Sequence, residues 1–434
     1  MTPTDVNAPV TYKRLLSGNK AVRYVWLSQI FGQSGDWLNL IALFALVGSG
    51  SNPATAIAFV LSLHYLCPFL LGPFAGMAAD RFDRRTILIV SDAIRIPIAL
   101  AFIWFGHSPI AVYLLAGLQY SAGAFFEPTR TALTQELAEG RELLAANSLG
   151  MATYGASGFV GMFAGGLLIT AFGTTVCFVV NALTFAISIF FLLRLGNYKP
   201  KARSDSEGQI LTWTDLFRLL GTNKRLAAAF LVKLSVGLLG GGYWVIVIRY
   251  AQGGVFTIGE GGNISNGIVN GTMFIGVFVA SILVNHFMAD ERKMPRNILG
   301  FLTARILLML VLFGAPFLLQ YGGAGTVGSF AIVLAAVLGQ SVAGAGAYIL
   351  STQLIKDLAP AAFHGRIFAI DLGLMNLGFG ASAIITGMLI DDGRFTLVDS
   401  NLYIAAVMTP LAVVWLMIMI SWDHWTQQTA SVAP

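Results

Sequence analysis

The sequence predicts an all-α membrane protein whose twelve transmembrane helices form two pseudo-symmetric bundles of six. Three features support this prediction: an apolar composition, a series of long apolar segments, and echoes between the two halves of the chain. The composition is 56% hydrophobic and 11% charged, whereas a soluble domain usually carries about 25% charged residues. A soluble chain this apolar would expose large apolar patches to water, while a lipid bilayer accepts such side chains.

Twelve segments are apolar enough to cross the ~30 Å hydrocarbon layer, which takes about 20 residues of helix. The segments are 24–48, 54–78, 86–105, 110–135, 144–171, 175–195, 227–251, 264–288, 297–319, 328–354, 366–390 and 402–421. They predict an N-terminal six-helix bundle at 1–195 and a C-terminal six-helix bundle at 224–434. The polar stretch 196–223 is predicted to be a cytoplasmic linker that contains a short amphipathic helix on the membrane surface.

The distribution of lysine and arginine predicts how the chain crosses the membrane. When the N-terminus is placed in the cytoplasm, nearly all basic loop residues fall on the cytoplasmic side, and the external loops carry chiefly Arg394. Cytoplasmic loops of membrane proteins hold an excess of basic residues. The first 20 residues also lack the apolar core and cleavage site of a signal peptide. We therefore expect a multi-pass protein of the cell inner (plasma) membrane with both termini in the cytoplasm.

The two halves of the chain repeat short patterns in equivalent places. Arg14-Leu-Leu-Ser-Gly-Asn-Lys20 precedes the first segment, and Arg218-Leu-Leu-Gly-Thr-Asn-Lys224 precedes the seventh, 204 positions later, with five of seven residues identical. A second set of matches joins segments four and five to segments ten and eleven at a constant offset of 221, starting at Thr131. Parallel repeats of this kind place a substrate site at their interface near the bilayer midplane.

The loop between the second and third segments reads Gly76-Met-Ala-Ala-Asp80-Arg81-Phe-Asp-Arg84-Arg85. It resembles the loop between helices 2 and 3 of the major facilitator superfamily, with Asp83 where that family usually has a second glycine. The resemblance implies the major facilitator fold, secondary transport, and a cytoplasmic gate in which Gly76 allows close helix approach. Gate roles are implied for Gly76, Asp80, Arg81, Arg84, Arg85 and Asp371. Asp371 is expected to contact Arg84 or Arg85. The alternative to a gate motif is an ordinary cytoplasmic loop that carries basic residues because of the positive-inside rule.

The fifth segment carries a run of small residues that includes Gly161, Gly165 and Gly166. It resembles the glycine-rich signature of superfamily antiporters, although Met162 replaces the proline of that signature. Small residues let neighbouring helices pack closely. The resemblance implies export by antiport, and generic helix packing is the alternative.

Two further phrases, Phe126-Glu-Pro-Thr-Arg130 and Leu143-Leu-Ala-Ala-Asn-Ser148, look like the superfamily branch of drug exporters, siderophore exporters and lysophospholipid flippases.

Ionisable residues inside the segments are candidates for function, because charge at membrane depth is costly. Asp36 lies about halfway along the first segment, and Glu127 and Arg130 lie three residues apart in the fourth. We interpret them as proton-coupling or substrate-contacting residues, with a structural network as the alternative. Asp92 and Arg95 are expected to form a structural pair, and Arg305 occupies the comparable place in segment nine. For Lys233, a lipid-facing and a central position are equally compatible with the sequence.

Polar and aromatic residues of several segments are candidates for lining a cavity: Gln119, Tyr120, Tyr243, Trp244 and Gln340. Few candidates are charged, and such a cavity suits an amphipathic or hydrophobic solute.

No nucleotide-binding loop, Ser/His/Asp set or metal-ligand cluster is visible in the sequence, so neither an enzyme nor a cofactor or metal site is predicted. The predicted function is secondary transport of a small molecule by alternating access, with proton-coupled export preferred. The alternatives are a lysolipid flippase of the same fold and a non-transporting receptor or intramembrane enzyme. The expected partners are a small-molecule substrate, membrane lipid and protons, without nucleic acid, and the protein is expected to be a monomer.

Overall fold

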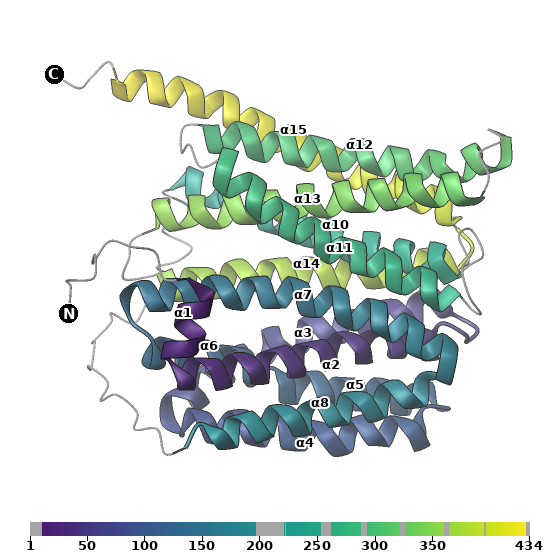
Figure 1. Ribbon diagram of the computed structural model, residues 1–434. Helices are drawn as coiled ribbons and strands as arrows, with labels where there is room; N and C mark the ends of the chain where they lie inside the picture. Colours follow the sequence, from purple (N-terminus) through teal and green to yellow (C-terminus); the bar gives the residue numbers. More distant parts are fainter. Residues whose placement is uncertain are drawn as a thin grey trace. The chain divides into compact units, whose positions relative to one another are not determined.

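A computed structural model of the chain describes residues 11–196, 221, 223–252, 262–287, 293–321, 326–359, 364–394 and 396–430. Within these residues every regular element is an α-helix (Figure 1). The predicted amphipathic helix of the linker, at 211–220, lies outside the described residues.

The helices of the first half follow the predicted segments closely. They are α1 (Tyr12–Gly18), α2 (Lys20–Val47), α3 (Pro53–Arg81), α4 (Arg84–Phe105), α5 (Pro109–Gly123), α6 (Phe126–Leu137), α7 (Gly140–Phe172) and α8 (Thr174–Arg194). The fourth predicted segment forms two helices, α5 and α6, because the chain makes a turn at Ala124 and Phe125. Pro128 follows this turn, and a proline cannot donate the backbone hydrogen bond that a continuous helix would need there.

The second half consists of α10 (Lys224–Gln252), α11 (Asn263–Phe287), α12 (Met294–Tyr321), α13 (Thr326–Leu358), α14 (His364–Asp391) and α15 (Leu397–Ala430). In the described part of the chain, eleven apolar spans are long enough to cross a membrane, and a shorter apolar stretch, Leu402–Ile418, lies within α15. The prediction of an all-α protein with twelve membrane helices is confirmed.

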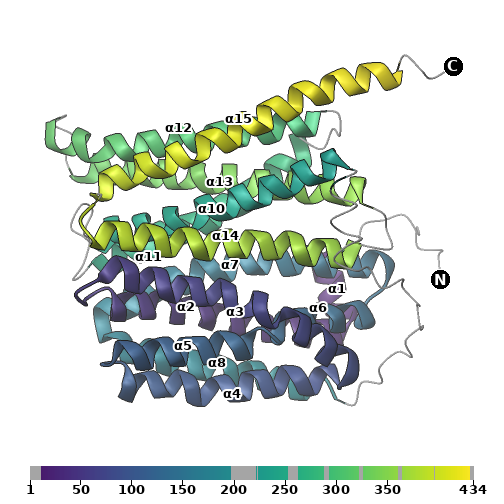
Figure 2. The ribbon, with the colours of Figure 1, turned by 180° about the vertical axis from the view of Figure 1, so that it is seen from behind.

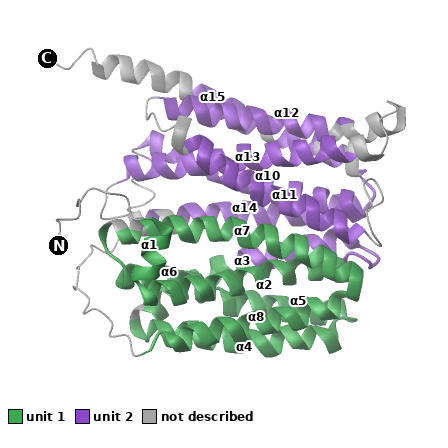
Figure 3. Ribbon diagram, in the orientation of Figure 1, with its two compact units in different colours: residues 1–46, 67–205 green, residues 47–66, 206–434 purple. Residues whose placement is uncertain are grey.

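The chain divides into two compact units, coloured separately in Figure 3. Unit 1 comprises 1–46 and 67–205, and unit 2 comprises 47–66 and 206–434. The first part of α3 belongs to unit 2 because it is bound to α14. The carboxylate of Asp391 accepts hydrogen bonds from the backbone N–H groups of Ala54 (3.2 Å) and Thr55 (2.7 Å), at the N-terminus of α3. A carboxylate is favourable there, because the first N–H groups of a helix have no partner within it.

Glycines bring two pairs of helices into close contact, one pair in each unit. In unit 1, a Cβ atom added to Gly161 of α7 would lie 2.8 Å from the Cβ atom of Trp37 in α2. In unit 2, a Cβ atom added to Gly241 of α10 would lie 2.8 Å from the carbonyl carbon of Phe379 in α14, and these two helices lie side by side in Figure 2. The same pairing of the first and fifth helices thus recurs in both units.

Substituting Gly161 by valine tests this packing. Gly161→Val is expected to lower the free energy of unfolding by about 1–3 kcal/mol, as overpacking of a tight contact does. The measurement is the melting temperature of the purified protein in detergent. Gly72→Val in α3 is the matched control, because a Cβ atom there would meet nothing within 4 Å. Equal melting temperatures for both variants would contradict the prediction.

Candidate functional site

The candidate site of unit 1 is a cluster of charged side chains around Arg95 of α4. The guanidinium donates from Nη1 to both carboxylate oxygens of Asp36 in α2, at 3.0 and 3.2 Å. Its Nη2 atom forms an ion pair with Asp92, one turn earlier on α4. Ser188 of α8 donates its hydroxyl to the second oxygen of Asp92 at 2.6 Å. This Arg95 cluster therefore connects α2, α4 and α8.

The members of the Arg95 cluster differ in their exposure. Arg95 and Asp92 are buried, whereas the side chain of Asp36 is 32% exposed. The guanidinium also lies over the rings of Phe185 and Phe126, at 4.2 and 5.2 Å from their centroids. Such contacts stabilise a cation that has left water. One guanidinium thus faces two carboxylates, and Asp36 is the carboxylate that the surroundings can reach.

The predicted pairing of Asp92 with Arg95 is present in the structure. The contact of Asp36 with the same guanidinium was not predicted. It joins two different helices, and the position of a residue along one helix does not show which side chains of another helix it meets.

Glu127 and Arg130 of α6 form the ion pair that their spacing predicted. Arg130 Nε donates to Glu127 Oε2 at 3.0 Å, and the side chain of Glu127 is 53% exposed. Near them, Gln29 of α2 donates to the carbonyl oxygen of Gly150 at 3.1 Å and to Gln33 Oε1 at 3.2 Å. No hydrogen bond described here joins this group to the Arg95 cluster, but Glu127 is close enough to Asp36 to interact with it electrostatically.

Two arginines of the motif, at the start of α4, bind neighbouring helices. Arg84 forms an ion pair with Glu136 and donates to the carbonyl oxygen of Ala132 at 2.9 Å. Arg85 donates to the carbonyl oxygens of Leu192 and Leu193, at 2.9 and 3.0 Å. These carbonyl groups lie at the C-terminus of α8, where a cation is favourable, and they also accept the backbone N–H groups of Leu195 and Gly196.

Other residues of the motif behave differently. Asp83, which replaces the usual glycine, caps α4 by accepting a hydrogen bond from the backbone N–H of Thr86 at 2.8 Å. Arg81 is exposed, and the side chain of Asp80 lies outside the described residues. A Cβ atom on Gly76 would meet no atom within 4 Å, so the close helix approach expected at Gly76 stays a prediction.

In unit 2, a buried ion pair joins Lys233 of α10 to Asp371 of α14, at 3.3 Å. Lys233 Nζ also donates to Thr352 Oγ1 at 2.5 Å and to the carbonyl oxygen of Tyr348 at 3.2 Å, and it lies 3.2 Å from the centroid of the Tyr348 ring. Both charged side chains are almost fully buried. Lys233 is therefore central in unit 2, and its lipid-facing alternative is excluded. Asp371, for which a contact with Arg84 or Arg85 was expected, pairs with Lys233 within its own unit.

The predicted cavity residues are all buried, within their separate units. In unit 1, both polar atoms of the Gln119 side chain lack a hydrogen-bond partner among the described residues. In unit 2, the indole of Trp244 donates to Asn270, whose amide donates to the carbonyl oxygen of Asn266 at 2.8 Å. Gln340 donates to the carbonyl oxygen of Arg305 at 2.6 Å.

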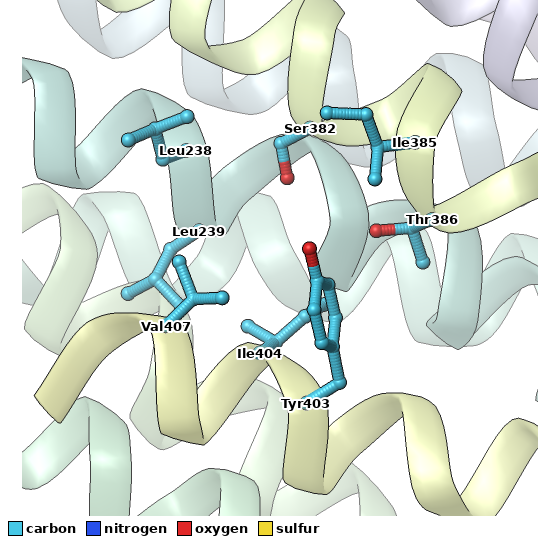
Figure 4. A pocket seen from close by; sticks show the side chains of 8 residues that line it. All are labelled: Leu238, Leu239, Ser382, Ile385, Thr386, Tyr403, Ile404 and Val407. Atoms are coloured by element: carbon cyan, nitrogen blue, oxygen red, sulfur yellow. The ribbon is translucent and has the colours of Figure 1, made fainter. Parts of the chain in front are cut away.

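A small pocket of about 50 Å³ lies in unit 2 between α10, α14 and α15 (Figure 4). Its lining residues are Leu238, Leu239, Ser382, Ile385, Thr386, Tyr403, Ile404 and Val407. Figure 4 shows the Tyr403 hydroxyl pointing toward Ser382 and Thr386. Ile385 and Val407 are exposed, so the pocket reaches the apolar surface of the unit. No feature of the sequence indicated this pocket, because its residues are ordinary membrane-helix residues.

Among the described residues, no group of three or more His, Cys, Asp and Glu side chains is arranged to hold a metal ion. The charged clusters described above are ion pairs between side chains of the chain itself.

Comparison with known proteins now decides the family. A family model described as the Major Facilitator Superfamily matches residues 25–328. The chain belongs to the Major Facilitator Superfamily. The predicted resemblance is thereby confirmed, and the protein is a membrane transporter rather than an enzyme.

Three relatives of this superfamily member are informative. YfiS of Bacillus subtilis (strain 168), an uncharacterized MFS-type transporter, is 26% identical, and the match covers 82% of this chain and 83% of YfiS. BacE of the same strain, a proposed bacilysin exporter, is 24% identical over 85% of this chain and 90% of BacE. The lysophospholipid transporter LplT of Serratia proteamaculans (strain 568) is 28% identical over 76% of this chain and 84% of LplT. These names match the predicted branch.

Solved structures of two transporters share the fold. The nucleoside transporter NupG is 14% identical with a TM-score of 0.71, and the match covers 92% of this chain and 99% of NupG. The POT family transporter PepTSo is 13% identical with a TM-score of 0.70, over 94% of this chain and 99% of PepTSo. At these identities the likeness concerns the fold alone.

The buried pair of Lys233 and Asp371 generates a testable prediction. Lys233→Met is expected to cost about 3–5 kcal/mol of stability, because it leaves an uncompensated buried carboxylate. The double variant Lys233→Met/Asp371→Leu is expected to recover most of that loss. The measurement is thermal unfolding in detergent.

A matched control is the exposed pair of Asp392 and Arg394, which lie 3.8 Å apart. Arg394→Met is expected to change stability by about 0–1 kcal/mol, as exposed ion pairs do. If Lys233→Met is as mild as this control, the buried pair does not stabilise unit 2.

Proposed function

We propose that this superfamily member is a secondary active transporter that exports a small amphipathic or hydrophobic solute in exchange for protons, by alternating access. It acts as a multi-pass protein of the cell inner membrane with both termini in the cytoplasm. The observation that carries the proposal is the Arg95 cluster, in which two carboxylates share one guanidinium.

The charge balance of the cluster suits a proton-coupled step. With both carboxylates ionised, the cluster holds one negative charge in excess, and excess charge is costly at membrane depth. One proton bound to a carboxylate makes the cluster neutral. Asp36 is the site for that proton, because its side chain is partly exposed while Asp92 is buried. Protonation of Asp36 lowers the free-energy cost of placing the cluster in an apolar environment, and release of the proton raises it. This difference couples proton movement to the alternation between the two access states of the transporter.

The direction and substrate class rest on independent support. The small residues Gly161, Gly165 and Gly166 resemble the antiporter signature, and Gly161 and Gly165 lie against α2, the helix that carries Asp36. BacE, a relative, is named as a proposed bacilysin exporter. The cavity candidates are polar or aromatic and uncharged, which favours an amphipathic solute. The proposal also gives Glu127 and Arg130 a role in coupling. It gives the motif from Gly76 to Arg85 the role of a cytoplasmic gate.

Replacement of Asp36 tests the coupling role. In proteoliposomes, uphill solute movement driven by a pH gradient is expected in the wild type and is expected to fall at least tenfold in Asp36→Asn, because the amide cannot bind and release the proton. Solute exchange without a gradient is expected to persist. The solute panel contains small antibiotics and peptides.

The matched control is Asp392→Asn, which removes an exposed carboxylate outside the cluster. Gradient-driven transport that is unchanged in Asp36→Asn would remove Asp36 from the coupling role.

A second candidate function is transport of lysophospholipids, which LplT carries out by its name. The pocket between α10, α14 and α15 favours it, because this pocket combines three hydroxyl groups with an apolar lining that reaches the surface. A single-chain lipid presents the same combination of polar head and apolar tail.

Filling the pocket tests this second function. Ile385→Trp is expected to slow the movement of labelled lysophosphatidylethanolamine in proteoliposomes about tenfold, because the indole occupies the space between the helices. Met388→Trp is the control, since Met388 is exposed on the same helix and does not line the pocket. Equal rates for the two variants would exclude the pocket from lipid movement.

A further inference from the structure

The two units repeat the surroundings of a buried arginine. Arg95 lies eleven residues after the first residue of α4, and Arg305 lies eleven residues after the first residue of α12. At the repeat offset of 221, Gln119 and Gly123 correspond to Gln340 and Gly344. A Cβ atom on Gly123 would lie 3.5 Å from Arg95 Nη1, and one on Gly344 would lie 3.4 Å from Arg305 Cζ. Each guanidinium therefore lies against the equivalent glycine of the next helix.

The acidic partners of Arg95 are not repeated in unit 2. Gly240 stands 204 positions after Asp36, at the offset that relates α2 to α10, and Leu302 stands 210 positions after Asp92, as Arg305 does after Arg95. Leu302 is buried. The two carboxylates that neutralise the first arginine have thus become a glycine and a leucine.

Arg305 consequently lacks a counter-charge among the described residues. The side chain is buried, with 4% of the residue exposed, and no carboxylate lies within ion-pair distance of it in that part of the chain. Its Nε atom contacts Gln340 Oε1 at 3.4 Å, while its Nη1 atom is buried without a hydrogen-bond partner there. An uncompensated buried cation is costly, and so is each unmade hydrogen bond.

A second polar group beside the guanidinium is also left without a partner. The hydroxyl of Tyr243 on α10 is buried and makes no hydrogen bond to the described residues, and Tyr243 is close enough to Arg305 to interact with it electrostatically. Both groups can donate to an anion. We call Arg305, Tyr243, Gln340 and Gly344 the Arg305 centre. It offers positive charge and two donors that have no partner among the described residues, within the apolar core of unit 2.

We propose that the Arg305 centre binds the anionic head group, a phosphate or carboxylate, of an amphipathic solute. The inference rests on the proposed transport function and names the charge of its substrate. Arginine suits this role, because its planar guanidinium binds phosphate and carboxylate oxygens through charge-assisted hydrogen bonds. In unit 2 the bound anion would take the place that Asp36 and Asp92 hold in unit 1.

Binding of simple probes tests the proposal without any transport step. The full-length protein in phosphatidylcholine nanodiscs is titrated calorimetrically with hexyl phosphate, hexanoate, hexyltrimethylammonium and inorganic phosphate. We expect the two hexyl anions to bind at least about tenfold more tightly than the cation with the same tail, because only the anions pair with the guanidinium. Inorganic phosphate is expected to bind more weakly than hexyl phosphate, since it lacks the tail. Equal binding of anion and cation would overturn the proposal.

Restoring the missing carboxylate provides the sharpest variant. Leu302→Asp places an acid one turn before Arg305, as Asp92 stands before Arg95, and is expected to reduce the affinity for hexyl phosphate about tenfold or more by neutralising the guanidinium. Leu302→Asn is the matched control, with nearly the same shape and no charge, and is expected to keep most of the affinity. Equal affinities of the two variants would overturn the proposal.

Substitutions of Arg305 itself provide a further test of the proposal. Arg305→Gln is expected to lose hexyl phosphate binding, and Arg305→Lys is expected to retain much of it, because the charge is kept. If Arg305→Gln does not fold, the comparison of Leu302→Asp with Leu302→Asn tests the proposal. Leu302→Asp is expected to fold, because the added aspartate supplies a counter-charge to Arg305. Retained binding in a folded Arg305→Gln protein would contradict the inference.

The source of the anion is identified by changing the lipid. In nanodiscs that contain phosphatidylglycerol, weaker apparent binding of hexyl phosphate to the wild type indicates that a lipid head group occupies the Arg305 centre, whereas unchanged binding indicates a free solute. Both outcomes retain an anionic ligand. Because no pH gradient is used, loss of proton coupling and loss of anion binding are distinguished.

Discussion

The contact between Arg95 and its two carboxylates is the constraint around which unit 1 is organised. A membrane interior gives an ion little solvation, so a charged side chain on one helix requires partners on others. Arg95 obtains them from α2 and from its own helix, while Ser188 of α8 completes the hydrogen bonds of Asp92. These electrostatic contacts hold α2, α4 and α8 in a fixed arrangement. In the same contact the carboxylate of Asp36 stays partly exposed.

Close packing through glycine allows this arrangement to be built on smooth helices. Between apolar helices in lipid there is little hydrophobic driving force, so association depends on close backbone approach and on polar contacts. Gly161 brings α7 against α2, and Gly241 brings α10 against α14. The first and fifth helices of each unit are therefore paired by the same device, and the charged residues Asp36, Lys233 and Asp371 all lie on these paired helices.

The two units share a framework but differ in charge. Unit 1 surrounds its buried arginine with acids, whereas among the described residues of unit 2 no acid pairs with the equivalent arginine. The packing positions recur because every helix needs neighbours, whereas the ionisable positions differ between the units. The difference underlies the two proposals made for the units: a proton-accepting acid in the first and an anion-accepting cation in the second.

The sequence by itself determined the twelve apolar helices, their approximate ends, the superfamily, and the i, i+3 pairs of Asp92 with Arg95 and Glu127 with Arg130. These follow from local composition and from helix spacing, which are properties of single segments. Only the tertiary structure decided that Asp36 joins Arg95, that Asp371 binds Lys233, and that Arg305 has no acidic partner in the described part of the chain. Such contacts depend on the rotation of each helix about its axis, and that rotation is set by packing between segments far apart in the chain. The break between α5 and α6 depends on one proline and its turn, which an apolar span of that length concealed.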